Sequence, residues 1–436
     1  MLQAMLSSVA SVKAQQTKIN VIGNNLANVN TTAFKGNRVS FGDMMSQTTR
    51  GATRPTEGRG GTNSVQYGLG VMVTGTDTNI EQGALNQTNR VNDLAIQGNG
   101  YFITSNAQRM AFSRDGGLEL DSSGTLIQRA TGERVIGWTA DVNGKIDSTS
   151  PLGPLNSIKI PVGQLNTVQV TTDTKWAGNL NSGATATDSV TTQMRIYDSI
   201  GGAHDVTLKA FNRTAPAAAG SPAGATASWD WEVYEGIPGT PGATLLGSSA
   251  TASNSKLFFD GNGKQISGLP VGSLNKITVA PGTGQSFTSF SVNLDFSNIS
   301  QLTGTSQLNG IEQNGFPQGG LQSYSIGQDG VITGIFTNGL TRPIAQVAMA
   351  NFSNPLGLER NGSNQFLSTD NSGYPIIGAP RSGSRGIVST GFLEQSNVDI
   401  SNEFTDLIVT QRGFQANTKI VTTVDEMLQD LINMKR

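Results

Sequence analysis

Residues 2–26 read LQAMLSSVASVKAQQTKINVIGNNL. Their apolar side chains recur at alternating spacings of three and four, which predicts a helix with one apolar stripe. The expected seam consists of Leu2, Met5, Val9, Val12, Gln16, Ile19, Gly23 and Leu26. A helix of this length is marginal in water when it stands alone, so another element must cover the stripe.

The other end of the chain carries a similar pattern. Residues 396–399 resemble a capping box, which predicts the start of a second helix. Apolar residues then recur every seven positions at Ile400, Leu407, Phe414, Val421 and Leu428. We expect residues 1–32 and 396–436 to form one α-helical core domain in which terminal helices pair as a coiled coil. The cover for each stripe could come from the other end of the same chain or from neighbouring chains.

The residues between the two ends are typical of β-strands and turns. Phe290, Val292, Leu294 and Phe296 alternate with polar residues, which predicts a strand with one buried face. Residues 229–233 show the same alternation, and strands are expected at 194–198 and 206–211 around a glycine turn. The chain has 54 glycines, which suits many short strands joined by tight turns. The expected fold class is therefore mainly β with α-helical termini.

Composition excludes several classes of function. Only 14% of residues are charged and the net charge is -2, so we expect no nucleic-acid partner and no membrane insertion. The chain has no cysteine and one histidine, which excludes disulfides, thiolate sites and a cluster of histidine ligands. The first residues lack the basic start and apolar run of a cleaved signal peptide. We expect no catalytic residue, no metal site and no cofactor.

Four motifs could suggest chemistry, and a simpler interpretation is favoured for each. Residues 141–147 resemble a calcium loop but lack its distal glutamate, so a turn is expected. Residues 260–264 are also expected to be a turn, because the spacing of a phosphate loop is missing. His204 is expected to be a surface histidine, because Asp205 beside it would point to the opposite face of a strand. Trp229 and Trp231 are expected to anchor a β-core and not to bind sugar.

The two ends also resemble a known family. Both the N-terminal and the C-terminal motifs resemble the signatures of the flagellar rod and hook axial proteins. The matching positions are Asn24, Asn25, Leu26, Ala27, Asn28, Phe34 and Lys35 at one end, and Asn397, Val398, Asp399, Gln411, Arg412, Ala416 and Asn417 at the other. Residues 93–102 and 112–116 are similar to the inner β-domain of that family.

A long insert separates the two halves, which makes the chain similar to hook proteins more than to the shorter rod proteins. Residues 197–207, 319–340 and 350–358 resemble hook segments. The resemblance implies nested discontinuous β-domains. It implies a linker or extension at 33–74, an inner β-domain at 75–150 and 318–395, and an outer β-domain at 151–317.

The resemblance implies a structural, non-catalytic subunit of the flagellar hook. Such subunits polymerise into a curved helical tube that acts as a flexible universal joint and transmits motor torque from rod to filament. Outer domains joined by polar linkers, such as residues 50–61, are expected to shift against each other. The implied partners are other copies of the chain, the rod, hook-cap and hook-filament junction proteins, and the type III export apparatus. The implied location is the extracellular hook.

Two alternatives remain at this point. The opening residues 1–5 are closer to those of rod proteins, which keeps a distal rod subunit open. A secreted β-rich adhesin would share the composition, although it would have no reason for seven-residue repeats at both ends.

Overall fold

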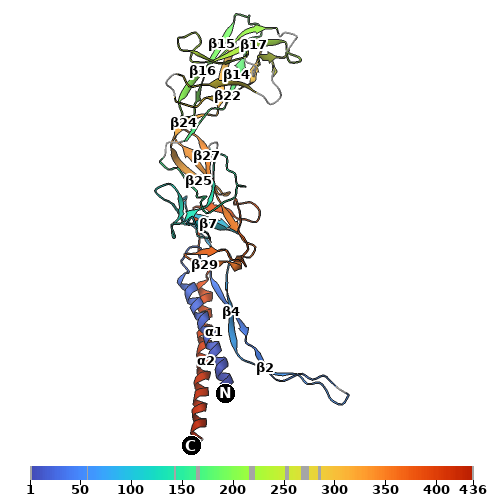
Figure 1. The fold of residues 1–436 in the computed structure, drawn as a ribbon, viewed down its shortest axis with the longest axis vertical. Coiled ribbons are helices and arrows are strands. Elements are labelled where there is room, and N and C mark those ends of the chain that lie inside the picture. The colour runs from blue at the N-terminus through green and yellow to red at the C-terminus, as the bar shows by residue number, and fades with distance from the viewer. Residues whose placement is uncertain are drawn as a thin grey trace.

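The computed structural model describes residues 2–55, 57–141, 144–163, 167–215, 221–250, 255–266, 274–282 and 286–434. The chain is elongated, with two terminal helices at one end, an inner β-region beside them and an outer β-region at the far end (Figure 1). Both termini lie at the helical end. The mainly β fold with helical termini is therefore confirmed. In the part of the chain that the structure describes, no helix has the length and apolar character needed to cross a membrane.

The terminal helices α1 (Leu2–Ala27) and α2 (Ile400–Asn433) lie side by side in opposite directions. Asn417 in the middle of α2 donates to Ser11 near the start of α1 at 2.8 Å. Asn25 at the end of α1 donates to Glu403 at the start of α2 at 3.0 Å. With 34 residues, α2 is about 51 Å long and extends past the start of α1 (Figure 1). The two ends of one chain thus pair with each other.

The start of α2 differs from the expected capping box. Asp399 is the N-cap, and its side chain accepts from the backbone N–H of Ser401 at 2.8 Å and of Asn402 at 3.3 Å. The helix cannot begin earlier because Asn397 is held outside it. Its amide accepts from Gly36 N at 2.8 Å and donates to Asn79 O at 2.9 Å.

The segment that follows α1 is a long two-stranded arm. Strand β1 (Asn37–Asp43) pairs with β4 (Val71–Thr78), and β2 (Ser46–Arg50) pairs with β3 (Val65–Gly68), all antiparallel. A further bridge joins Thr53 to Thr62. Residues 50–61 were expected to link domains, and this prediction is wrong. The described residues among them, 50–55 and 57–61, form the far end of the arm, where Thr53 and Thr62 pair (Figure 1).

The inner β-region is built from two segments that are far apart in the sequence. One sheet has the order β29-β30-β8-β7-β11-β10-β9, with β28 beside β7 and β31 beside β28, and a second sheet has the order β12-β27-β26-β25. Strands β32 and β33 return to pair with β6 and β5. The bounds from the first segment are β5 (Leu85–Gln87), β6 (Leu94–Gln97), β7 (Tyr101–Ser105), β8 (Met110–Ser113), β9 (Leu118–Leu120), β10 (Leu126–Gln128), β11 (Arg134–Val135) and β12 (Gly137–Thr139). Those from the second are β25 (Leu321–Ile326), β26 (Val331–Phe336), β27 (Thr341–Val347), β28 (Met349–Asn351), the 3-10 turn η1 (Pro355–Gly357), β29 (Glu359–Gly362), β30 (Gln365–Leu367), β31 (Ile376–Gly378), β32 (Ile387–Thr390) and β33 (Phe392–Glu394).

The core of the inner β-region contains residues from both segments, including Phe102, Leu126 and Val347, all fully buried. Ile158 and Ile160 join this core, although the boundary expected at 150/151 would assign them to the outer domain. Their backbone explains the difference. Leu126 N donates to Ile158 O at 3.0 Å, and Ile160 N donates to Gly124 O at 2.7 Å. The inner region therefore extends at least to residue 160.

The outer β-region packs two sheets around one core. The sheet orders are β21-β22-β14-β23 and β15-β16-β17-β19-β20, with β18 beside β17. Trp176, Trp229 and Trp231 are fully buried between them. The expected core role of the tryptophan pair is therefore confirmed. The strands are β14 (Asp173–Asn179), β15 (Ser189–Tyr197), β16 (Ala203–Thr214), β17 (Ala227–Glu235), β18 (Thr244–Ser248), β19 (Leu257–Phe259), β20 (Gln265–Ile266), β21 (Asn275–Val279), β22 (Phe290–Ser300) and β23 (Gln307–Gln313).

The strands expected at 194–198, 206–211, 229–233 and 290–296 are all present, as β15, β16, β17 and β22. The expectation for His204 is half right. Its neighbour Asp205 is exposed and faces the other way, but His204 itself is only 7% exposed, so the surface assignment is wrong. Two carboxylates, Asp198 and Glu235, satisfy its ring nitrogens and allow the burial.

The outer and inner β-regions meet at a thin neck. It contains the paired strands β13 (Thr167–Gln169) and β24 (Phe316–Gly319) (Figure 1). The chain passes outward through β13 and returns through β24.

The turn at residues 260–264 is confirmed, since Asp260 accepts from Asn262 N and Lys264 N. Asp141 makes the corresponding bond to Lys145 N at 2.7 Å, while residues 142–143 lie outside the described residues.

Candidate assembly site

The contact between α1 and α2 includes several polar pairs. Besides the two amide contacts above, Lys18 pairs with Asp406 at 3.5 Å. At Gly413, a Cβ atom would stand 2.8 Å from the Gln15 side chain, so glycine allows the close approach. The Oε1 atom of Gln15 is buried without a hydrogen-bond partner among the described residues. A buried oxygen without a partner lowers the stability of the contact between the helices.

The seam predicted for α1 does not coincide with its buried face. Val9, Gln16 and Gly23 are exposed, while Met5, Val12, Ile19 and Leu26 are half-buried, and the side chain of Leu2 lies outside the described residues. The buried residues are Ser8, Ala14, Ile22 and Asn25. The helix is therefore turned so that much of its apolar stripe lies beside the contact with α2 and not within it.

The seam predicted for α2 is also covered only in part. Leu407, Phe414, Val421 and Leu428 are half-buried, and Ile400 is 46% exposed. The fully buried positions of this helix are Thr410 and Val424, each three residues after a predicted seam position. The seven-residue repeat of apolar residues did not predict the burial of Thr410, because the side chain of Thr410 is polar.

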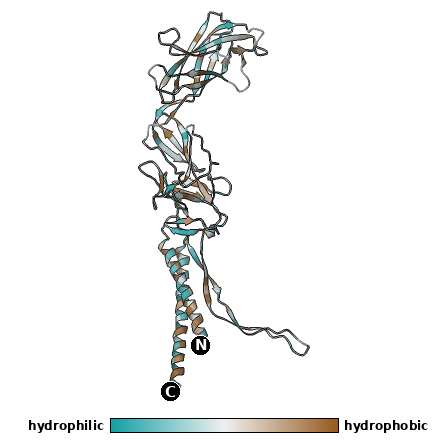
Figure 2. Ribbon diagram, viewed as in Figure 1, coloured by the Kyte–Doolittle hydropathy of each residue, from teal (hydrophilic) through white to brown (hydrophobic). Residues whose placement is uncertain are grey.

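Further large apolar side chains of α2 are open to solvent. Val409 is 63% exposed and Ile432 is 70% exposed, and Met434, the C-cap residue of the helix, is 85% exposed. The others in this group are Phe404, Ile408, Ile420, Met427 and Leu431. Figure 2 shows hydrophobic residues along both helices, including the part of α2 that extends past α1. An apolar surface of this extent on one element marks an interaction site.

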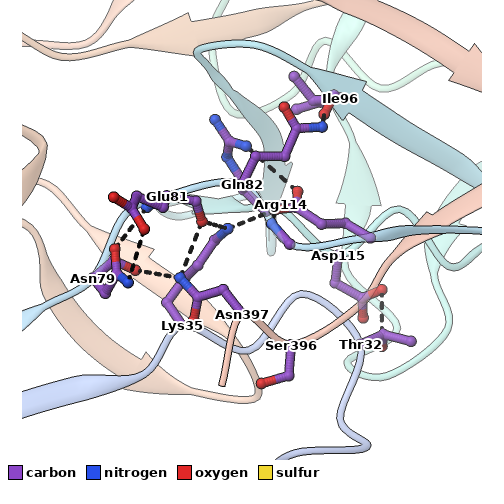
Figure 3. Close-up of polar contacts among 12 residues, drawn as sticks. Thr32, Lys35, Asn79, Glu81, Gln82, Ile96, Arg114, Asp115, Ser396 and Asn397 are labelled. Atoms are coloured by element: carbon purple, nitrogen blue, oxygen red, sulfur yellow. Dashed lines mark hydrogen bonds and ion pairs between the residues drawn. The ribbon is translucent and has the colours of Figure 1, made fainter. Parts of the chain in front are cut away.

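The helices join the inner β-region through a buried ion cluster (Figure 3). The Glu394 side chain is fully buried at the end of β33. Its Oε1 atom accepts from Lys35 Nζ at 2.5 Å and from Gly83 N at 2.9 Å, and its Oε2 atom lies 3.4 Å from Arg114 Nη1. Lys35 also donates to Glu81 O at 2.7 Å. One carboxylate thus ties together four separate segments, and we call this group the Glu394 lock.

The Glu394 lock is shielded from solvent, and this burial changes the pKa of Lys35. Burial lowers the pKa of the Lys35 ammonium, and the charge and hydrogen bond of Glu394 oppose that change. Arg360 covers the cluster from outside. It donates to Lys35 O, and its guanidinium lies 5.2 Å from the Phe34 ring centroid. Removing one charge from such a cluster would leave the others uncompensated.

The signature residues differ in their position and burial in the structure. Asn25, Phe34, Lys35 and Asn397 meet at the junction, where Asn25 exchanges hydrogen bonds with the backbone of Asn37. Leu26, Val398 and Asn417 are half-buried, and Asp399 caps α2. Asn24, Ala27, Gln411, Arg412 and Ala416 are exposed, and Asn28 is half-buried. Glu394 and Arg114 were not predicted as site residues. Both residues lie within the segments that resemble the family, but nothing in the sequence indicated that they would meet.

The arm presents a second surface without cover from its own chain. Met45 is 83% exposed and Tyr67 is 55% exposed. Its far end carries Arg50, Arg54 and Arg59, all exposed. The structure thus places both apolar and basic groups on an extension that points away from the body of the molecule (Figure 1).

A substitution at Gly83 tests how tightly the junction is packed. A Cβ atom there would stand 2.1 Å from the carbonyl oxygen of Gln395, so Gly83→Ala must displace the backbone beside the lock. We expect a loss of about 1–3 kcal/mol in unfolding free energy, measured by hydrogen exchange of the junction peptides. The control is Gly23→Ala, where the added atom meets nothing within 4 Å. Equal unfolding free energies of Gly83→Ala and Gly23→Ala would contradict the tight packing at the junction.

The described residues contain no group of three or more histidine, cysteine or acidic side chains that could hold a metal. The features without cover from their own chain are surfaces. They are the free faces of the helices and the arm, held on the β-regions by the Glu394 lock.

Comparisons with known proteins cover the whole chain. Residues 5–35 match the family described as flagella basal body rod protein, and residues 389–434 match the C-terminal family of the flagellar basal body rod FlgEFG proteins. Residues 95–175 match the flagellar hook protein FlgE/F/G D1 domain, and residues 164–316 match the flagellar basal body protein FlaE D2 domain.

Full-length relatives give the same picture. The chain is 35% identical to the flagellar hook protein FlgE of Borreliella burgdorferi, over 100% of both chains. It is 30% identical to FlgE of Salmonella typhimurium, over 98% of this chain and 99% of the relative. It is 28% identical to the flagellar basal-body rod protein FlgG of Bacillus subtilis, over 100% of both. A crystal structure of Helicobacter pylori flagellar hook protein FlgE2 covers 71% of this chain and 100% of its own, at 14% identity and a TM-score of 0.48.

Proposed function

The chain belongs to the flagellar hook protein family and is a structural subunit of the bacterial flagellar hook. From this premise we propose that its copies polymerise through their terminal helices into a curved helical tube. In that tube the helices form the inner layer and the β-regions point outward. Head-to-tail contacts of this kind extend into filaments and do not close into rings.

One observation carries this proposal: the contrast between closed β-cores and open helices within a single chain. The large core residues of both β-regions are nearly inaccessible, whereas Ile408 and Val409 of α2 are more than half exposed. The proposed contact surface comprises the predicted seams and the exposed apolar side chains of α2. Neighbouring copies would cover these residues, as they cover the helices of other self-assembling chains.

We place the flexibility of the tube at the neck and not at residues 50–61. Strands β13 and β24 are the short connection between the two β-regions, so small rotations there move the outer region as a unit. The arm, with its exposed Met45 and Tyr67, would reach a neighbouring subunit. A firm helical layer and outer regions that shift on their necks would let the hook bend while it transmits torque from rod to filament.

The remaining partners follow from the place of a hook in the flagellum. They are the rod, the hook cap and the hook-filament junction proteins, together with the type III export apparatus that would deliver the chain without signal cleavage. We propose that the protein acts outside the cell, without catalytic activity, cofactor, nucleic acid or membrane insertion. The full-length match to hook proteins displaces the alternative of a β-rich adhesin.

Deleting residues 2–27 tests the assembly role of α1. The deletion removes one partner of α2 but no strand of either β-region, so the β-regions should keep their circular dichroism. We expect polymerisation, followed by light scattering and electron microscopy, to be abolished. Tubes of normal form from the truncated chain would contradict the proposal.

Immuno-electron microscopy of hook-basal bodies separates the hook from a distal rod subunit. An antibody against residues 186–317 should label the curved extracellular segment along its length. Label confined to the straight rod would instead favour the rod alternative, which the full-length similarity to the Bacillus subtilis rod protein makes worth testing.

A further inference from the structure

His204 lies at the start of β16, buried between two carboxylates. Its Nδ1 atom is 2.7 Å from Glu235 Oε1 at the end of β17, and its Nε2 atom is 3.1 Å from Asp198 Oδ2 in the turn before β16. A neutral imidazole has only one N–H, so it could donate to only one of these acceptors. The geometry suits an imidazolium, which donates from both nitrogens.

Other groups around the ring add no competing charge. Phe287 and Phe290 lie edge-on to it, with ring centroids 4.9 and 6.3 Å away. The hydroxyl of Thr244, from β18, lies 3.4 Å from the second Glu235 oxygen. Arg195 and Asp205 belong to the same hairpin but pair with each other on its exposed face, at 2.8 Å. Within the part of the chain that the structure describes, the charged groups that face the imidazole are therefore Asp198 and Glu235.

The same aspartate shapes the turn that touches the neck. Asp198 Oδ1 accepts from Ile200 N at 2.9 Å and from Gly202 N at 2.7 Å. This holds Gly201 with φ +86° against the neck, where a Cβ atom would stand 2.8 Å from Gln318 N of β24 and 3.3 Å from Val168 of β13. A continuous set of contacts thus runs from the imidazole through Asp198 and the turn to both neck strands.

We propose that protonated His204 is a pH-sensitive brace that limits the movement of the outer β-region on its neck. With the imidazolium in place, Asp198 is fixed and the turn presses on β24. After loss of the proton, one nitrogen presents a lone pair to a carboxylate, the contact becomes repulsive, and the turn loosens.

The sign of the pH effect follows from the surroundings. Burial alone would lower the pKa of His204, but the hydrogen bonds and charges of Glu235 and Asp198 outweigh it and raise the pKa above the ordinary value of about 6.5. The brace therefore contributes fully below about pH 6.5 and is lost as the pH rises through the folded-state pKa. An outer region on a braced neck is therefore stiffer below the folded-state pKa of His204 than above it.

Two features of the sequence allow the brace to be tested with few interfering signals. The chain has one histidine, so ¹⁵N-histidine labelling of the full chain gives one imidazole, whose nitrogen shifts report its charge directly. It also has no cysteine, so spin labels can be attached only where cysteines are introduced. Suitable positions are Ala130→Cys in the inner β-region and Ala223→Cys in the outer, both on exposed turns.

We expect both ring nitrogens to be protonated at pH 6.5 and below, and the inter-label distance distribution to broaden as His204 loses its proton at higher pH. His204→Gln should give the broad distribution at all pH values. Asp205→Asn is the matched control, because it breaks the exposed ion pair of the same hairpin and should leave the pH response unchanged. A His204 pKa at or below about 6.5, or a distance distribution whose width does not change as His204 titrates, would overturn the brace. The first measurement uses the unaltered chain and so does not depend on the variants folding.

Discussion

Replacing Glu394 by glutamine is expected to lower the opening free energy of the junction by about 3–5 kcal/mol, because a buried ion cluster loses its only anion. A glutamine amide can accept at one atom, but its NH₂ would face the Lys35 ammonium or the Arg114 guanidinium. Both cations would remain nearly inaccessible, at 3% and 6% side-chain exposure. The expected result is faster hydrogen exchange, by at least two orders of magnitude, in peptides that contain Lys35 and Glu394.

The matched control for this variant is Glu119→Gln. Glu119 also lies near two arginines, Arg90 and Arg129, but its side chain is 43% exposed. Surface ion pairs contribute about 0–1 kcal/mol, so this control should change exchange little. A double variant, Lys35→Met with Glu394→Leu, should recover part of the loss, because it removes the buried pair as a unit. An effect at Glu394 no larger than that at Glu119 would mean that the lock does not hold the junction.

Val409→Asp is expected to raise the concentration needed for polymerisation at least a hundredfold. Val409 is 63% exposed in the single chain, so an aspartate there should change monomer stability by no more than about 0.5 kcal/mol. In the tube the same carboxylate would be buried without a partner, at a cost of about 3 kcal/mol or more. The measurement is the critical concentration for tube formation, with circular dichroism of the monomer beside it.

Val409→Leu is the control at the same position, since it keeps the surface apolar and should polymerise normally. Leu407→Asp, at a half-buried seam position, should also block assembly, but with some loss of monomer stability. Normal tubes from Val409→Asp would show that this face of α2 stays uncovered.

The fold class could be predicted from the sequence because its patterns are local. Alternation at Phe290–Phe296 and seven-residue repeats from Leu407 to Leu428 depend on the geometry of one strand or one helix. The orientation of α1 could not be predicted, since the choice of face rests on Asn417, Gly413 and Asp406, nearly the whole chain away. The same holds for the Glu394 lock, which joins Lys35 to a residue 359 positions later.

The predictions for residues 50–61 and for His204 were wrong for the same reason. Residues 50–61 have the composition of a linker, and composition does not reveal that their flanks pair with each other as an arm. The burial of His204 could not be predicted either, because one of its two carboxylate partners, Glu235, lies 31 residues further along the chain. In each case a contact distant in sequence decided the local outcome, which is the information that periodicity lacks.

The nested order of the chain also sets the order in which it can fold. Residues 167–319 form one continuous insert, so the outer β-region can close as soon as they are available. The inner β-region needs β32 and β33, and the Glu394 lock cannot form before residue 394 has arrived. In a chain delivered from its N-terminus, α1 would wait longest for its partner, since α2 emerges last. Each subunit would thus become competent to join its neighbours only when its delivery is complete, so half-delivered chains could not be built in.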